Sequence, residues 1–207
     1  GTAQITATIG GVEVLGSLTV NSAGNFIHAT PPTADAANVI SIYTEAYPNV
    51  PVNYYNGYWQ PYQTTQSADF TVNGDNVLNY TNFNFVGIEF STPTVNASGM
   101  SHLHIDLYFP NALPAGATFQ IGLLDAGADG VLNNVNDVRG NKTFTASALT
   151  SPNWVSLDIP FSEFAGLTNR AHLAQIIFEG TNITNFYADN IYFVNDGLSG
   201  IIRKYIS

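Results

Sequence analysis

Short runs of alternating hydrophobic and polar residues recur along most of this 207-residue chain. The runs are rich in β-branched and aromatic residues, and Gly, Pro, Asn or Asp separates them, which is the pattern of strands joined by turns. No stretch keeps a helical period beyond one or two turns, and only residues 161–167 could form a single helical turn. The sequence therefore predicts an all-β fold, an antiparallel β-sandwich of the jelly-roll type. The predicted strands are residues 39–47, 68–72, 76–90, 102–109, 118–125, 142–147, 154–160, 173–180 and 185–194.

The two ends of the chain have a different pattern from its centre. Residues 1–20 contain two short apolar runs around Gly10 and Gly11, which predicts a β-hairpin because glycine supplies the positive φ of a tight turn. Residues 21–38 are small and polar and contain a Pro-Pro pair, as expected of a linker. The sandwich then extends over residues 39–194. Residues 195–207 form a tail, which is either a linker or a short strand paired with the hairpin.

Charge and composition narrow the range of partners. The chain has five basic and fifteen acidic residues, for a formal net charge of −10. Nucleic-acid binding needs clustered Lys and Arg, so we exclude it, and strongly anionic polysaccharides are disfavoured by the same sign of charge. The absence of cysteine excludes disulfides and thiolate metal sites. No run of residues approaches the length of a membrane span, so we expect no such span.

The densest cluster of candidate binding residues lies in residues 54–62. Pyranose rings present C–H groups that pack on flat aromatic faces, and Asn and Gln nearby can bond to sugar hydroxyls. Five aromatic residues in nine positions, interrupted by Gly and Pro, cannot all enter a core. The alternative is a strand that lines the sandwich and caps its edge. The candidate ligand-binding residues, with Trp59 first, are Trp59, Tyr58, Tyr54, Tyr55 and Tyr62.

Two further strands raise the question of chemistry on a second face. In residues 154–160 the aliphatic positions form the core face, and we expect Trp154 to pack structurally. In residues 102–109 a polar stripe alternates with core residues, and its His-x-His-x-Asp order resembles a metal site but lacks a further patterned ligand. We expect a solvated or sugar-contacting face, with His104 and Tyr108 as additional ligand candidates.

Catalytic motifs are missing from the sequence. No nucleophile elbow, zinc-binding helix, phosphate loop or dinucleotide fingerprint is present. Residues 125–137 contain three aspartates but not the complete calcium-loop pattern, so we interpret them as a Gly- and Asn-rich turn. A glycosidase would need two carboxylates across a cleft, and fifteen acidic residues make chance pairs easy. We therefore expect no enzymatic activity.

The run from Asn38 to Val194 resembles the carbohydrate-binding jelly-roll modules attached to glycoside hydrolases and found in surface glycan-binding proteins of Bacteroidetes. The matching pieces are NVISIYTEAY, NGYWQ, NVLNYTNFNFVGIEF, MSHLHIDLYF, LLDAGADGVLNNVNDV, NWVSLDIPFSEFAGLTNRAHLAQIIFEG and FYADNIYFVN. Residues 47–63 depart from that family in being unusually rich in tyrosine. The hairpin of residues 1–20 resembles the end of a bacterial Ig-like domain.

The resemblance implies a non-catalytic β-sandwich, often with a structural Ca²⁺ that joins the first strand to the last. Glu45 and Asp189 are the residues in those places, and each could instead be an ordinary edge carboxylate. The expected function is polysaccharide binding at the cell surface or outside the cell, with further domains possible in the same polypeptide. A neutral β-glucan such as laminarin fits the charge. A lyase or glycosidase on the same fold, or a structural spacer domain, is the alternative.

Overall fold

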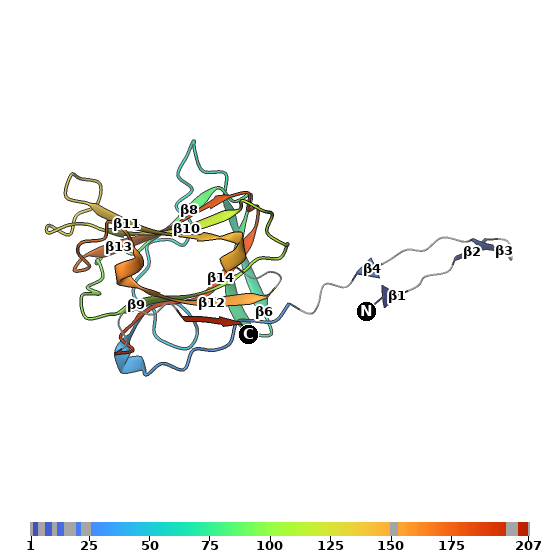
Figure 1. Ribbon diagram of the computed structural model, residues 1–207, viewed down its shortest axis with the longest axis horizontal. Helices are drawn as coiled ribbons and strands as arrows, with labels where there is room; N and C mark the ends of the chain where they lie inside the picture. Colours follow the sequence, from blue (N-terminus) through green and yellow to red (C-terminus); the bar gives the residue numbers. More distant parts are fainter. Residues whose placement is uncertain are drawn as a thin grey trace.

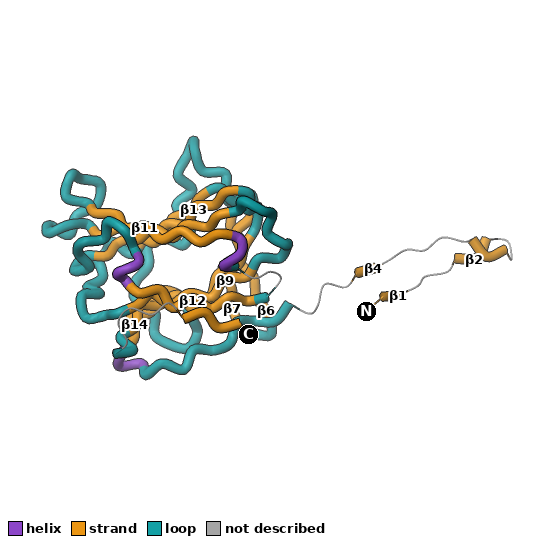
Figure 2. The backbone as a smooth tube through the Cα atoms, viewed as in Figure 1, coloured by secondary structure: helices purple, strands orange, loops and turns teal. Residues whose placement is uncertain are grey.

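The computed structural model describes residues 26–149 and 153–197, together with strand residues 2–3, 7–9, 12–14, 20–21 and 203–206. Its centre is a sandwich of two antiparallel sheets (Figures 1 and 2). The described residues hold three 3-10 helices, η1 (Ala36–Asn38), η2 (Ala146–Ala148) and η3 (Phe161–Glu163), and no α-helix. The predicted all-β sandwich is confirmed, and the helical turn expected within residues 161–167 is present as η3.

One sheet has four strands in the order β11-β10-β13-β8, and the other has seven, β15-β12-β9-β14-β7-β6 with β5 beside β14. In chain order the sandwich strands are β5 (Val39–Tyr43), β6 (Gln66–Val72), β7 (Asp75–Thr81), β8 (Phe85–Glu89), β9 (His102–Tyr108), β10 (Thr118–Asp125), β11 (Val138–Thr145), β12 (Trp154–Pro160), β13 (Leu173–Thr181), β14 (Phe186–Val194) and β15 (Arg203–Ile206).

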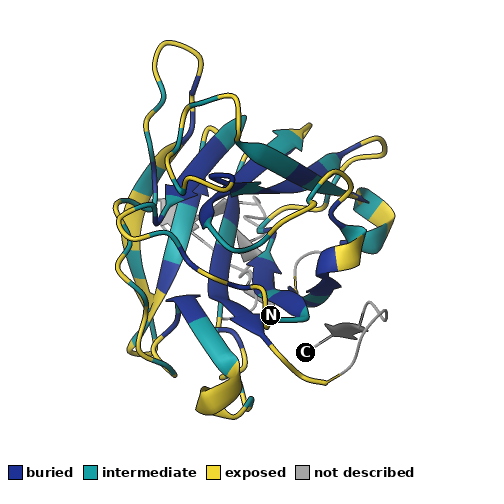
Figure 3. Ribbon diagram, turned by 90° about the vertical axis from the view of Figure 1, so that its left-hand side faces the viewer, coloured by how far each residue is buried: buried dark blue, intermediate teal, exposed yellow. Residues whose placement is uncertain are grey.

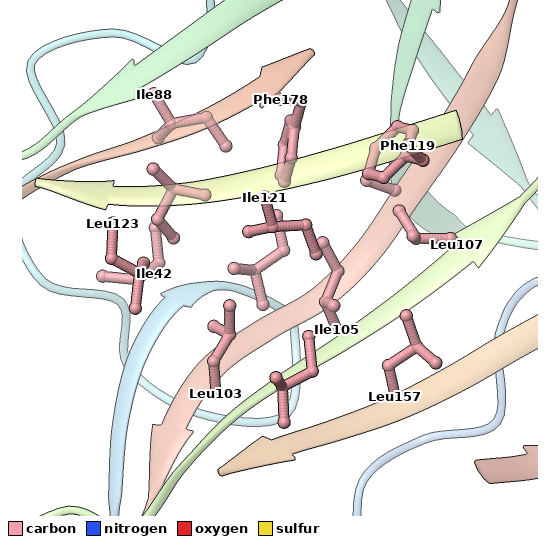
Figure 4. Packing of buried hydrophobic residues seen from close by; sticks show 14 of the residues in the cluster. Ile42, Ile88, Leu103, Ile105, Leu107, Phe119, Ile121, Leu123, Leu157 and Phe178 are labelled. Atoms are coloured by element: carbon pink, nitrogen blue, oxygen red, sulfur yellow. The ribbon is translucent and has the colours of Figure 1, made fainter. Parts of the chain in front are cut away.

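Alternation along the strands builds the core between the sheets. Ile121 and Leu123 of β10 face Leu103 and Ile105 of β9, and all four side chains are fully buried (Figure 4). Phe119, Phe178 and Phe186 fill one end with tilted and edge-on ring contacts, the geometry that aromatic pairs favour. The polar positions between these residues face outward, so each sheet has an outer face on which function can be built.

The run of residues 76–90, predicted as a single strand, is two strands on different sheets. Asn82 has a φ of 51°, a left-handed conformation that Asn tolerates better than most residues and that breaks a strand. The chain leaves the seven-stranded sheet after β7 and enters the four-stranded sheet as β8. The apolar character continues through this crossover because Phe83 packs into the core there, so hydropathy alone does not mark the break.

Residues 26–34, which lie in the predicted linker, pack on the outer face of the seven-stranded sheet (Figure 1). Phe26 contacts the rings of Tyr108, Tyr187 and Trp154. The indole Nε1 of Trp154 donates a hydrogen bond of 2.7 Å to the carbonyl of Ile27. We call residues 26–34 the N-terminal strap. The buried environment of Trp154, which is 4% exposed, confirms its expected structural role.

The remaining terminal strands are short. Among the described residues, β2 (Ala7–Ile9) pairs with β3 (Val12–Val14), and β1 (Thr2–Ala3) pairs with β4 (Val20–Asn21). Neither pair belongs to a sheet of the sandwich. At the other end, β15 pairs with β12 at the edge of the seven-stranded sheet, so the tail contributes a strand to the sandwich.

Candidate functional site

The outer face of the four-stranded sheet carries polar side chains from all four of its strands. Alternation places them opposite the core residues of the same strands, and the register aligns them in three rows across the sheet. One row contains mostly small or apolar residues, and the two flanking rows contain most of the hydrogen-bonding groups. From β8 to β11 the rows are Phe85, Glu179, Gln120 and Thr143; Gly87, Ile177, Gly122 and Asn141; and Glu89, Gln175, Leu124 and Arg139.

Glu89 organises one end of this face. Its carboxylate accepts hydrogen bonds from the Tyr54 hydroxyl at 2.6 Å and from the Gln175 amide at 2.8 Å. The Ser91 hydroxyl donates a third bond at 2.7 Å. Partial burial acts to raise the pKa of Glu89, but these three bonds outweigh it and hold the pKa below its ordinary value. Glu89 is therefore an ionised acceptor with fixed neighbours.

Glu179 organises the other end. Its carboxylate accepts from the guanidinium of Arg139 and from the amide of Gln120. The carbonyl oxygen of Gln120 in turn accepts from the Thr143 hydroxyl at 3.1 Å. Arg139 lies over Gly122, where an added Cβ would be 2.6 Å from its Nε. Because Gly122 has no side chain, the guanidinium can lie directly on the backbone of β10. The Nε of Arg139 has no hydrogen-bond partner.

Trp59 lies at the β8 edge of the same face. A Cβ on Gly87 would be 2.1 Å from Cη2 of the Trp59 ring, so the ring rests directly on the backbone of β8. Its Nε1 donates to the hydroxyl of Tyr54 at 3.2 Å, which links the ring to Glu89. Gln63 fixes the loop, because its side chain accepts from the backbone N–H of Trp59 and its own N–H donates to the Trp59 carbonyl. The indole is thus a positioned aromatic surface beside polar groups.

The other predicted tyrosines do not join Trp59 and Tyr54. Tyr55 packs against the core and donates its hydroxyl to the carbonyl of Ile42. Tyr58 points toward β6, where its hydroxyl is 3.0 Å from that of Ser67. Tyr62 is 78% exposed and lies in the segment between β5 and β6. The aromatic run therefore divides between two sides of the sandwich.

His104 and Tyr108 lie on the outer face of the other sheet, under the N-terminal strap. Tyr108 contacts Phe26 edge-on with ring centroids 4.5 Å apart. His104 stacks on Tyr192 and bonds to Asp158 at 2.6 Å. The expectation that this stripe is a solvated or sugar-contacting face is wrong for its buried members, because His102 and Asp106 are each 1% exposed. Figure 3 shows the general pattern, in which buried residues follow the strands and exposed residues gather in the loops. The polar groups of the stripe are paired within the protein instead.

The imidazole of His104 is held between two carboxylates. Its Nδ1 faces Asp158, and its Nε2 lies 3.7 Å from Oδ1 of Asp106. Burial lowers the pKa, but the hydrogen bonds and charges of the two aspartates outweigh burial and raise it to about 9. The neighbouring Ser156 donates its hydroxyl to Asp106, not to His104. The imidazole is therefore a cation that holds structure together, without the free nitrogen that a base for Ser156 would need.

Glu45 and Asp189 lie near a junction where β5 and β7 meet the two halves of β14. Asp189 is fully buried, and its Oδ2 has no hydrogen-bond partner. Burial and the charges of Asp75, Asp106 and Glu45 raise its pKa to about 8. Glu45 accepts a bond from the backbone of Asn76 at 3.2 Å. Burial and the adjacent Glu45 raise the pKa of Asp75 to about 6.

Comparison with known proteins supports the fold but gives no close relative. No family model and no curated protein matches the chain. A crystal structure of a family 30 carbohydrate-binding module superposes with a TM-score of 0.55 at 12% identity, covering 79% of this chain and 91% of that one. The family 30 module of the Clostridium thermocellum cellulosomal cellulase Cel9D-Cel44B gives a TM-score of 0.54 at 13% identity, covering 77% and 99%.

The chain has the jelly-roll fold of carbohydrate-binding modules. On this fold, the sequence analysis predicted Trp59 and Tyr54 as binding residues but did not name the polar groups of the same outer face that are hydrogen-bond partners of Tyr54 or of one another. Those partners are Glu89, Gln175, Glu179, Gln120 and Arg139. Four of them occupy the non-core positions of predicted strands, so alternation could have placed them on an outer face. Which of the two outer faces stays open depends on the strap, and that contact has no sequence pattern.

Proposed function

We propose that this domain binds a polysaccharide on the outer face of its four-stranded sheet. The observation that supports it is the arrangement of Trp59 on Gly87, joined through Tyr54 to the Glu89 and Gln175 pair. The ring offers an apolar surface for sugar C–H groups, and the carboxylate and amide groups offer fixed partners for hydroxyls. The opposite sheet cannot offer the same, because the N-terminal strap occupies its aromatic residues.

The ligand we propose is a neutral β-glucan such as laminarin. The formal net charge of −10 opposes an anionic chain. Arg139, a cation on this face, already neutralises Glu179. Carboxylates and amides bond to neutral hydroxyls without ion pairing, so we expect binding that changes little with salt.

The domain acts in this proposal without catalysis. Ser156, His104 and Asp158 occur together, but both imidazole nitrogens face carboxylates and Ser156 donates to Asp106. Glu89 and Glu179 on the binding face are each engaged by hydrogen-bond donors. A bound module of this kind would raise the local concentration of an attached enzyme or cell on its substrate. This role places the domain outside the cell or at its surface, joined to further domains.

We also propose a structural Ca²⁺ at the junction of β5, β7 and β14, held by Glu45 and Asp189. Supporting this, Asp189 has a buried oxygen without a partner, and the charge of Glu45 helps to raise the pKa of both Asp75 and Asp189. Among the described residues, no three His, Cys, Asp or Glu side chains converge as a complete metal site. Amide and backbone oxygens would therefore have to complete the ligand set, as calcium permits. The ion would neutralise the buried charge and join the segment that follows β5 to β14.

The test of the main proposal is affinity electrophoresis of the whole chain against a panel of algal and plant polysaccharides, with reducing-end release measured on every binder. We expect retention by laminarin or another neutral β-glucan, little change between 50 mM and 500 mM NaCl, and no released ends. Tightest retention by alginate would refute the assignment of sugar class. Released ends would replace the binding function by a hydrolase or lyase activity.

No described helix has the length and hydropathy of a membrane span.

A further inference from the structure

A second hollow lies away from the proposed glycan face, between the β6–β7 ribbon and residues 43–58. Its volume is about 890 Å³, within the range of roughly 300–1,000 Å³ typical of small-molecule sites. The β6–β7 ribbon forms one edge of the seven-stranded sheet and faces the segment that follows β5. We call this hollow the tyrosine trough and define it by Tyr43, Tyr55, Tyr58, Asp69, Asn76 and Leu78.

The register of the ribbon explains which residues face the trough. Tyr80 points into the core and pairs with Ser67, so Leu78 and its partner Asp69 lie on the same inner face. Phe70 and Val77 point the other way and pack under the N-terminal strap. The inner face of the ribbon therefore presents an apolar floor at Leu78 with a carboxylate beside it.

The facing wall consists of tyrosine rings. Tyr43 and Tyr55 pack edge to face with centroids 5.2 Å apart. Tyr58 is 45% exposed and is held in the left-handed conformation, with a φ of 45°, by a bond of 2.9 Å from its N–H to the Asn56 side chain. Such a conformation costs free energy in a bulky residue and persists only where surrounding contacts enforce it.

Hydrogen bonds join the two walls of the trough. The hydroxyl of Tyr58 meets that of Ser67 at 3.0 Å, and Glu45 accepts from the backbone of Asn76 at 3.2 Å. A long chain that passed straight through would have to break one of them. The trough is therefore shaped for a short ligand or for the end of a chain, unlike an open sheet face.

We infer that the tyrosine trough is a second binding site, which takes one or two residues of a neutral saccharide. The rings provide apolar surface for C–H groups, while Asp69 and Asn76 provide partners for hydroxyls. The lining contains no Lys or Arg, and its carboxylate Asp69 lies outside the proposed calcium ligands, so a uronic acid or a sulfated sugar is repelled. The inference shares only its ligand class with the proposed function, because the two sites have no residue in common.

The test is a titration of the isotopically labelled whole chain by NMR, with laminaritetraose and cellotetraose as probes and an alginate tetrasaccharide as the anionic control. Signals of the Asp69 and Asn76 amides report the trough, and the indole N–H of Trp59 reports the other face. We expect both sets to shift with a neutral probe, with different Kd values. The variant Asp69→Asn should weaken binding at the trough at least tenfold and leave the Trp59 titration unchanged.

The outcomes separate the two proposals. If the Trp59 indole shifts and the trough signals stay fixed at saturation, the second site is refuted and the proposed function stands. If the trough alone responds, the second site is supported and the four-stranded face is refuted as the main site. No response at either place to any neutral probe refutes both. Asp69→Asn is isosteric and exposed, and Tyr58→Ala provides an independent variant with the same expected effect.

Discussion

Replacement of Gly87 by alanine tests the proposed glycan face without touching a group that contacts the sugar. A Cβ at this position would lie 2.1, 2.5 and 2.9 Å from three atoms of the Trp59 ring. Carbon atoms do not approach so closely, so the ring must leave the sheet and lose its bond to Tyr54. Alanine itself suits this buried strand position, whose φ is not in the left-handed region. The substitution therefore displaces the Trp59 ring by a methyl group on β8, beneath the ring, and leaves Trp59 itself unchanged.

The expected loss of affinity follows from the stacking free energy that the Trp59 ring contributes. Stacking of a flat ligand on one aromatic side chain contributes on the order of 1–3 kcal/mol, taking the scale known for nucleic-acid bases. Gly87→Ala should therefore weaken laminarin binding about 5- to 150-fold, and Trp59→Ala should do the same. In the Trp59→Ala background, Gly87→Ala should change the affinity little, because no ring remains to be displaced.

Isothermal titration of the four proteins with a laminarin oligosaccharide measures this cycle, and melting temperatures show that each protein is folded. Gly99→Ala is the matched control, since a Cβ there meets nothing within 4 Å, and its affinity should equal that of the wild type. The reasoning fails if Gly87→Ala binds normally. It also fails if Gly87→Ala weakens binding equally with and without Trp59.

Three further predictions concern stability. The raised pKa of His104 stabilises the fold by at most about 3 kcal/mol, fully below pH 6.5, and this stabilisation is lost as the pH rises through about 9. Urea unfolding of the wild type at increasing pH should show the decline. An equally steep decline in His104→Gln would contradict the assignment to His104. EDTA should lower the melting temperature and Ca²⁺ should restore it, whereas Asp189→Asn should melt identically in both; a wild type indifferent to EDTA removes the calcium site. Trp154→Ala should lower the free energy of unfolding by about 3–5 kcal/mol and leave the glycan affinity of the folded protein unchanged. If urea unfolding shows no loss of stability, the contact of Trp154 with the strap is not structural.

The tyrosine-rich segment shows how far sequence reasoning reaches at the site. The segment follows β5, and its Gly, Pro and Asn residues mark it as irregular, so an exposed aromatic cluster could be predicted. Trp59 and Tyr58 are adjacent in sequence and yet face different sheets, because Tyr58 adopts a left-handed φ and turns its side chain toward β6. A single dihedral angle of this kind has no reliable sequence signal in a tyrosine.

The N-terminal strap shows the same limit for domain boundaries. Its composition of small residues and prolines is typical of a linker, and locally it is one, since it contains no strand. Phe26 nevertheless finds Tyr108, Trp154 and Tyr187 across the sheet. One aromatic residue among polar neighbours gives no period, and only the assembled sheet supplies the surface that it covers.

From the amino-acid sequence alone, most of the strands and their core faces could be predicted, as could a composition that suits hydroxyl-rich ligands. These properties are local, since alternation with a period of two places every second side chain in the core wherever the strand ends up. The pairing of strands and sheets in space decides that β7 and β8 separate at Asn82, that the strap covers one sheet, and that Tyr54 links Trp59 to Glu89 on the other. These contacts join residues far apart in the chain, and their free energy depends on burial and charge that exist only once both sheets have formed.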